Sequence, residues 1–313
     1  MKQAIIFPGQ GSQSIGMGRE IAASFPEARA VFEEVDDTLS QKLSTLMFEG
    51  PLEELTLTEN AQPALMAVSM ALVRVLEKGN IPIHTFSYAA GHSLGEYSAL
   101  CATNAFTLSD TATLLRARGL AMKDAVPNGK GGMMAILGGD LETIEKLCEE
   151  ASQFGICTIA NDNCPGQIVI SGEIVALEQI PALAEKHGVR KCISLNVSGP
   201  FHSILMEPAA LIMKKYLEET PTRDPIVPIL PNVTAVPETR HDFLRNMLVR
   251  QITGQVRWRE TLLKLQDLGV KRLVEVGSGT VLTGLVKRTC PEMEVFSIHT
   301  PQELDAFVNK ISV

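Results

Sequence analysis

A short apolar run that leads directly into a glycine–serine turn constrains the fold of this chain more than any other feature. Residues 86–90 have the composition of a buried strand, the sequence Gly-His-Ser-Leu-Gly follows at residues 91–95, and residues 94–102 have the pattern of a helix. A strand that passes into a helix through so short a turn is typical of a strand–helix–strand unit, whose strands run parallel. The pattern therefore predicts an α/β protein.

The rest of the chain repeats this alternation. Further strands are predicted at residues 4–7, 226–230 and 272–276, and amphipathic helices at residues 60–78 and 108–122. Strands that alternate with helices favour a doubly wound parallel sheet with helices on both faces.

The middle of the chain has a different order of elements. Between residues 132 and 197 the pattern predicts strand, helix, strand, strand, helix and strand, at residues 133–137, 141–151, 157–160, 167–171, 174–187 and 191–197. This βαββαβ order is that of ferredoxin-like domains. We therefore expect a discontinuous large domain (residues 1–127 and 198–313) that carries a small inserted domain (residues 128–197).

Composition excludes several classes of protein. The chain has 36 acidic and 28 basic residues and a net charge of -8, which disfavours nucleic acid as a partner because phosphate binding needs a basic surface. Its six cysteines include no Cys-x-x-Cys pair, which favours reduced thiols and a cytoplasmic protein. No signal peptide is expected, and no apolar run approaches the ~20 residues of a membrane span.

Ser93, at the centre of the glycine turn, is a candidate nucleophile. The sequence Gly-x-Ser-x-Gly between a strand and a helix is typical of a nucleophile elbow, in which glycines leave room beside the serine. The helix N-terminus would direct backbone N–H groups towards developing negative charge. The alternative is an ordinary turn in which the serine caps the helix.

A serine nucleophile needs a base, and the chain has six histidines. His202 is the best candidate because it follows a Ser-Gly-Pro-Phe turn at the return to the large domain, although it could equally cap a helix. His92 lies inside the turn, where its side chain is not expected to reach its neighbour's hydroxyl. An unperturbed imidazole pKa of ~6.5 would suit proton transfer in both directions near neutral pH. No acid partner for the histidine stands out.

Two further features bear on substrate binding. The glycine-rich loop at residues 7–13 lacks the spacing of dinucleotide and P-loop motifs, so its use would be to present a backbone N–H group, unless it is only a turn. Arg118 lies on the helix predicted after the turn, and its guanidinium could bind a carboxylate with two hydrogen bonds. Arg116 and Lys123 are more typical of a solvated helix face.

These motifs occur together, in this order, with a pattern of Gly-Pro-Phe-His-Ser at residues 199–203 and Val-Arg-Gln at residues 249–251. In combination the chain resembles the malonyl-CoA:acyl carrier protein transacylases of fatty-acid synthesis, which are related to the acyltransferase domains of polyketide synthases. The resemblance covers essentially the whole chain. It implies a hydrolase-like α/β domain with a ferredoxin-like insertion, and an active site in the cleft between them.

The resemblance also implies roles for particular residues. Ser93 would be the nucleophile and His202 the base, with the backbone carbonyl of Gln251 orienting the imidazole in place of an acid. The backbone N–H groups of Gln10 and Leu94 would form the oxyanion hole.

Substrate contacts are implied at Arg118, which would bind the malonyl carboxylate, and at Met122 and Asn161. The partners would be malonyl-CoA and, transiently, acyl carrier protein with its phosphopantetheine arm. The reaction would be ping-pong acyl transfer by a monomer, with no metal and no cofactor.

Two other functions fit part of the pattern. A serine esterase shares the Gly-x-Ser-x-Gly turn, but it would use an acidic third member of the triad and has no need of Arg118. A catalytically silent relative that serves as a docking surface is the second alternative, which the presence of Ser93, His202 and Arg118 together disfavours.

Overall fold

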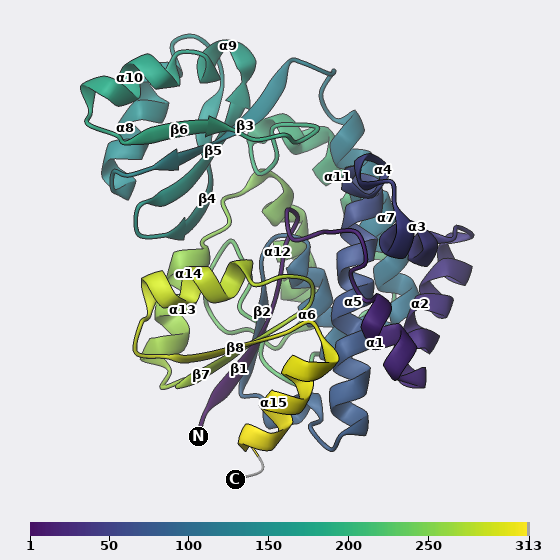
Figure 1. The fold of residues 1–313 in the computed structure, drawn as a ribbon. Coiled ribbons are helices and arrows are strands. Elements are labelled where there is room, and N and C mark those ends of the chain that lie inside the picture. The colour runs from purple at the N-terminus through teal and green to yellow at the C-terminus, as the bar shows by residue number, and fades with distance from the viewer. Residues whose placement is uncertain (312–313) are drawn as a thin grey trace.

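The computed structural model describes residues 1–311 and contains two four-stranded β-sheets, which lie at different heights in Figure 1. All neighbouring strands of the first sheet are parallel, in the order β2-β1-β7-β8. Its strands are β1 (Gln3–Phe7), β2 (Tyr88–Gly91), β7 (Arg272–Val276) and β8 (Glu294–Ile298). The expected α/β fold with a parallel sheet is therefore present.

The central strand β1 is buried on both faces, as its unbroken apolar run requires. Ile5 and Phe7 belong to the hydrophobic core shared with one group of helices, and Ala4 and Ile6 to a separate core on the opposite face. The helices of the first core include α2 (Pro26–Leu39), α5 (Thr58–Lys78) and α7 (Leu108–Asp124), and those of the second are α13 (Trp258–Asp267) and α14 (Val281–Thr289).

Helix α5 fills the space between the sheet and an outer layer of helices, and nearly all of its 21 residues are buried. The remaining helices of this part are α1 (Arg19–Ser24), α3 (Leu43–Glu49), α4 (Leu52–Thr56), α6 (Gly95–Ala102), α11 (Glu207–Glu219), α12 (His241–Thr253) and α15 (Pro301–Ile311). Within residues 1–311, neither α5 nor any other helix is long and apolar enough to cross a lipid bilayer.

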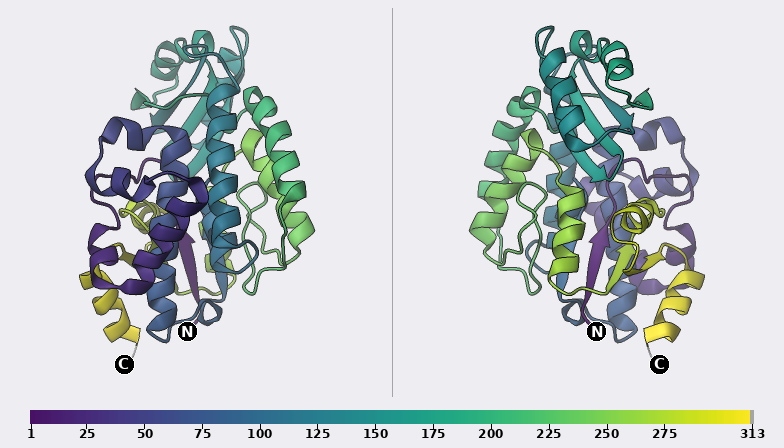
Figure 2. Two further views of the ribbon diagram at one scale, coloured as in Figure 1. Left: turned by 90° about the vertical axis from the view of Figure 1, so that its right-hand side faces the viewer. Right: turned by 90° about the vertical axis from the view of Figure 1, so that its left-hand side faces the viewer.

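The second sheet is antiparallel, in the order β4-β5-β3-β6, and lies at the top of both views in Figure 2. The chain passes through β3 (Gly131–Leu137), α8 (Leu141–Ala151), β4 (Cys157–Cys164), β5 (Gln167–Glu173), α9 (Ile174–Leu177), α10 (Ile180–Lys186) and β6 (Lys191–Ser194). One face packs on these three helices and forms a hydrophobic core of its own. The other face turns towards the rest of the molecule.

Strand β4 ties the antiparallel sheet to the segment before α13. The backbone of Asn161 bridges that of Val256, and the N–H of Asp162 donates to the Val256 carbonyl at 3.0 Å. The N–H at Nε of Arg259 is shared between the two oxygens of the buried Asp162 carboxylate, at 2.9 and 3.0 Å, and Nη2 of Arg259 lies 2.8 Å from one of them. These contacts fix the position of β4 above the end of the parallel sheet.

The predicted strand at residues 226–230 is wrong. Only Ile229 forms bridges there, to Ala89 and Glu238. Pro225, Pro228 and Pro231 flank these apolar residues, and each proline lacks the N–H that a strand would donate.

Further details differ from the expectations, and the strand expected at residues 157–160 extends to Cys164 as β4. Strand β8 was not expected. The helix predicted at residues 174–187 is divided into α9 and α10, where Pro181 occupies the first turn of α10. Strand β6 ends at Ser194 rather than at residue 197.

Candidate active site

Ser93 lies in the turn between β2 and α6 and has a positive φ of 52°, a strained conformation for a residue with a side chain. A Cβ atom at Gly91 would lie 1.9 Å from the carbonyl group of Gly95, and one at Gly95 would lie 2.4 Å from the carbonyl oxygen of Phe7. Side chains at either position would overlap the backbone. The two glycines are therefore a steric requirement of the turn that presents Ser93.

Asn232 holds this strained turn from the side. Its amide oxygen accepts a hydrogen bond from the Ser93 backbone N–H at 2.7 Å, and its amide nitrogen donates to the Gly91 carbonyl at 2.7 Å. The side chain is buried, so both hydrogen bonds are shielded from water. Sequence reasoning did not identify Asn232, which lies 139 residues from Ser93 and in no recognisable motif.

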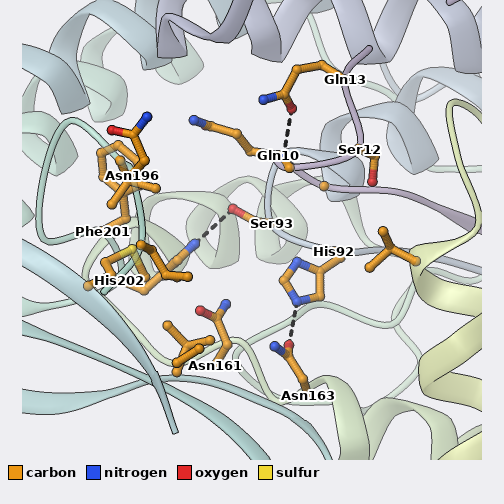
Figure 3. Close-up of a pocket in the computed structure, with 18 of the residues that line it drawn as sticks. Gln10, Ser12, Gln13, His92, Ser93, Asn161, Asn163, Asn196, Phe201 and His202 are labelled. Atoms are coloured by element: carbon orange, nitrogen blue, oxygen red, sulfur yellow. Dashed lines mark hydrogen bonds between the residues drawn. The ribbon is translucent and has the colours of Figure 1, made fainter. Parts of the chain in front are cut away.

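The Ser93 hydroxyl lies 2.8 Å from Nε2 of His202 (Figure 3). On the other side of the ring, Nδ1 of His202 lies 2.8 Å from the backbone carbonyl of Gln251. A carbonyl oxygen can only accept, so Nδ1 carries the hydrogen and Nε2 is left free to accept the serine proton. The structure thus places Ser93, His202 and Gln251 in the order that a nucleophile, a base and an orienting group require.

The environment of His202 differs from the expected one. The side chain is 4% exposed. Burial is the main cause that lowers the pKa of His202 to about 3, and the positive charge of Arg118 is the second. The expectation of an unperturbed imidazole is therefore wrong. At neutral pH the ring is neutral and can accept a proton from Ser93.

Arg118, on α7, reaches the same point from another direction. Nη2 of Arg118 donates to the Ser93 hydroxyl at 3.2 Å and to Oε1 of Gln251 at 2.8 Å, and Nη1 donates to Oε1 of Gln62 at 2.7 Å. The side chain is 1% exposed, and burial lowers the pKa of this guanidinium. No carboxylate forms an ion pair with it anywhere in residues 1–311. The guanidinium also lies over the ring of Tyr97, 5.6 Å from its centroid. A buried cation whose hydrogen bonds in the described chain go to neutral oxygens is suited to receive a carboxylate from a ligand.

The other two basic residues of this helix are held away from the cavity. Nζ of Lys123 lies 2.6 Å from a carboxylate oxygen of Glu59. Arg116 is half-buried and donates to the side-chain oxygens of Asn60, at 3.0 Å, and of Gln41. The expectation of a solvated helix face therefore describes Lys123 better than Arg116.

Ser93, His202 and Arg118 line one cavity of about 360 Å³ between the two sheets. Figure 3 shows Ser93 and His202 within it. The predicted substrate residues Met122 and Asn161 are part of its lining. The other lining residues from the antiparallel sheet include Met133, Ala135, Asn163, Gln167 and Val169.

His92 also borders the cavity, but its ring is turned away from Ser93 (Figure 3). Nε2 of His92 lies 2.8 Å from the amide oxygen of Asn163, and the ring packs edge-on against Trp258 with 5.5 Å between centroids. Burial lowers the pKa of His92. The structure therefore assigns His92 to the support of the turn and not to a contact with the serine hydroxyl.

The two residues expected to form an oxyanion hole are Gln10 and Leu94. Gln10 borders the cavity, and its side chain donates to the Thr58 hydroxyl at 3.1 Å. Leu94 directly precedes α6 and its side chain is buried. In the described part of the chain, the backbone N–H of neither residue donates to a protein acceptor, which leaves both available to a ligand oxygen.

Glu96 is a second residue that sequence reasoning missed, although it directly follows the Gly-x-Ser-x-Gly turn. It is completely buried on α6, and its Oε2 accepts from the Asn232 backbone N–H at 2.9 Å and from Nε2 of Gln251 at 2.8 Å. Burial raises the pKa of Glu96 to about 7. A glutamate next to a glycine turn carries no signal that it is buried, so only the three-dimensional structure shows it.

A strained serine, a neutral histidine oriented by a carbonyl group, and a buried guanidinium in one cavity form a site of the serine–histidine acyl-transfer class. Comparison with known proteins places the chain within that class. Residues 4–303 match the acyl transferase domain family, and the chain belongs to this family.

Its similarity to individual members extends over the full length. It is 43% identical over 311 residues to the malonyl CoA-acyl carrier protein transacylase of Bacillus subtilis, covering 99% of this chain and 97% of that protein. An acyl-carrier-protein S-malonyltransferase structure from Bartonella henselae has a TM-score of 0.98 at 50% identity and covers all of both chains. A malonyl-transacylase solved in complex with its type II PKS acyl-carrier protein has a TM-score of 0.96 at 38% identity, covering 99% of this chain and 100% of that one.

Proposed function

We propose that this protein transfers the malonyl group of malonyl-CoA to the phosphopantetheine thiol of acyl carrier protein and so supplies fatty-acid elongation. The observation that carries the proposal is the position of Arg118. Its buried guanidinium donates to the Ser93 hydroxyl and has no carboxylate partner of its own within residues 1–311. An acyl group on Ser93 that ends in a carboxylate would supply that partner. The similar proteins from Bacillus subtilis and Bartonella henselae are named for this reaction.

The first half of the proposed cycle forms an ester on Ser93. The Ser93 oxygen attacks the thioester carbonyl carbon while Nε2 of His202, 2.8 Å away, takes the hydroxyl proton. The carbonyl oxygen becomes an oxyanion, which accepts hydrogen bonds from the backbone N–H groups of Gln10 and Leu94. Collapse of this intermediate breaks the carbon–sulfur bond, and the departing thiolate of coenzyme A takes the proton from His202.

The second half reverses these steps with a different thiol. The phosphopantetheine thiol gives its proton to His202 and attacks the malonyl ester, and Ser93 recovers a proton as it leaves. The Gln251 carbonyl stabilises the imidazolium in both halves, since it lies 2.8 Å from Nδ1. Bonds and protons balance among the thioester, Ser93 and His202, so the proposed cycle requires no metal and no redox cofactor.

Met122 and Asn161 complete the proposed substrate site. Met122 is buried beside Arg118 on the same helix, and its sulfur accepts a weak hydrogen bond from Gln62. Asn161 extends from β4 into the cavity (Figure 3). All of these residues come from one chain, so we propose that a monomer is sufficient for activity.

We further propose that residues 128–197 form a ferredoxin-like domain inserted into a hydrolase-like domain of residues 1–127 and 198–313, of which the last two residues lie outside the described part. Three observations support this division: the βαββαβ order, the strand order β4-β5-β3-β6, and the separate hydrophobic core of this segment.

Mass spectrometry of the intact protein tests the proposed function. After brief exposure to a mixture of malonyl-, methylmalonyl- and acetyl-CoA, the protein should gain the mass of one malonyl group, and peptide mapping should place it on Ser93. The variant Ser93→Ala should gain no mass. Addition of the holo carrier protein should remove the group within seconds to minutes. Absence of any malonyl ester, or a preference for acetyl, would contradict the proposal.

A further inference from the structure

The guanidinium of Arg118 is held by two side-chain amides, one from α5 and one from α12. Nη1 donates to Oε1 of Gln62 at 2.7 Å, and Nη2 donates to Oε1 of Gln251 at 2.8 Å. Both acceptors are buried and neutral. They can fix the direction of the guanidinium without neutralising its charge, and its charge remains available to a carboxylate on the substrate.

An amide can hold an arginine only if its oxygen faces the guanidinium. The oxygen and nitrogen of a glutamine side chain are nearly identical in shape, so the orientation must be set by the hydrogen-bonding groups on the far side. The nitrogen of Gln251 is surrounded by acceptors: Oε2 of Glu96 at 2.8 Å, the backbone carbonyl of Ser93 at 3.0 Å and the amide oxygen of Asn232 at 3.3 Å. Rotation of the amide by 180° would place its N–H groups against Arg118 and its oxygen against three acceptors.

The hydrogen bond to Glu96 is the shortest of these three, and the Glu96 carboxylate has a second hydrogen-bond donor that holds it in place. Its Oε2 also accepts from the backbone N–H of Asn232 at 2.9 Å, and Oε1 has no hydrogen-bond partner among the described residues. With two N–H groups directed at Oε2, any proton that Glu96 binds belongs on Oε1. Oε2 is therefore an acceptor in both protonation states, and it specifies the same orientation of the Gln251 amide in both.

We propose that the side chain of Gln251 is a positioning residue that directs Arg118 at the acid group of the substrate, and that Glu96 determines which end of the Gln251 amide faces Arg118. This inference rests on the proposed malonyl transfer. It gives Gln251 two separate duties, because its backbone carbonyl accepts from His202 whatever its side chain is. Side-chain substitution can therefore test the second duty apart from the first.

The readout is the ratio of kcat/KM for malonyl-CoA to kcat/KM for acetyl-CoA, which a general loss of structure would not change. Gln251→Met removes the amide at similar length and should lower this ratio at least tenfold, as expected for loss of a hydrogen bond to a charged group. Glu96→Met should lower the ratio in the same direction. Glu96→Gln, the matched control, retains an oxygen that can take the place of Oε2, and its ratio should lie closer to the parent value than that of Glu96→Met.

Gln251→Glu keeps the shape of the side chain and serves if Gln251→Met does not fold. Its carboxylate would pair directly with Arg118 and compete with the substrate acid, so the ratio should again fall. An equal loss of malonyl and acetyl transfer in the Gln251 variants would overturn the proposal, because it would indicate damage to His202. Equal ratios in Glu96→Met and the parent would overturn the role of Glu96. The malonyl ester on Ser93 of the parent protein reports separately on the proposed function.

Discussion

The cavity lies between the loops of the parallel sheet on one side and the antiparallel sheet on the other, and only the first wall carries a charged side chain and the serine–histidine pair. On the parallel-sheet side, Ser93, Arg118 and Gln251 form one connected set of hydrogen bonds, in which the side chains of Arg118 and Gln251 are buried. On the antiparallel side, the sheet contributes apolar side chains and uncharged amides, namely Met133, Ala135, Val169, Asn161, Asn163 and Gln167. The first wall therefore carries the groups that can react with the substrate or bind its charged group. The second wall determines the shape of the cavity.

This contrast predicts where substitutions change the reaction and where they change only the fit of the substrate. Removal of a group from the first wall should alter rate or acyl preference. Removal of a group from the second wall should alter KM with little effect on either. Four experiments test this division, beginning with the largest expected effect.

Ser93→Ala should abolish the malonyl ester and lower transfer by about a thousandfold or more, because no covalent route remains. The fold should be retained, since only a hydroxyl group is lost from a turn that glycines and Asn232 hold in place. The measurement is malonyl transfer from malonyl-CoA to carrier protein, with circular dichroism as the control for folding. Turnover close to that of the parent would exclude Ser93 as the nucleophile.

Arg118→Ala should lower the malonyl-to-acetyl ratio of kcat/KM by roughly a hundredfold or more, because a substrate carboxylate would then be buried without a partner. Arg118→Lys should give an intermediate ratio, since an ammonium group offers a point charge rather than two parallel hydrogen bonds. The ratio is measured for both variants and the parent under the same conditions. An unchanged ratio in Arg118→Ala would mean that this residue does not bind the carboxylate of the malonyl group.

The pH dependence of kcat/KM should reflect the lowered pKa of His202. Burial and the charge of Arg118 both favour the neutral ring, and His92 is a further titratable neighbour that acts in the same direction. A base with a pKa of about 3 remains unprotonated as the pH falls from 7 to 5.5, so kcat/KM should change less than about twofold. An ordinary imidazole would lose about tenfold over the same range. A tenfold loss, with the fold intact by circular dichroism, would contradict the neutral buried ring.

Asn161→Ala tests the second wall and should have the smallest effect of the three substitutions. Loss of one neutral hydrogen bond to the substrate should raise KM for malonyl-CoA by about threefold to tenfold, while kcat and the malonyl-to-acetyl ratio stay near the parent values. Steady-state kinetics with both acyl-CoAs provide the measurement. A large fall in kcat at unchanged KM would show that the antiparallel sheet takes part in the chemistry, and the division between the walls would fail.

The sequence predicted the parallel α/β fold because its signals are local. The apolar run of β1, the glycine turn around Ser93 and the amphipathic pattern of α5 each lie within a short stretch of chain. The strand predicted at residues 226–230 shows the limit of such signals: its composition is apolar, but the prolines around Ile229 prevent a ladder of hydrogen bonds.

Fewer residues of the candidate site than elements of the fold could be predicted from the sequence. Ser93 and Arg118 could be proposed from motifs and residue chemistry, and His202 was chosen among the six histidines by its place in the chain. Asn232 and Gln62 could not be proposed, because amide side chains carry no pattern and act here across 139 and 56 residues of sequence. Their roles depend on which distant segments the fold brings together.

The close approach of Gly91 and Gly95 has a consequence for engineering. Both glycines lie against backbone atoms rather than side chains, so the backbone of the turn that carries Ser93 does not depend on the side chain at position 122. A designer could enlarge the space near Met122 to admit a branched or longer acyl chain without displacing the nucleophile. Acyl preference can therefore be changed by single substitutions in the cavity. The turn of residues 91–95 would have to be transferred to another protein as one unit.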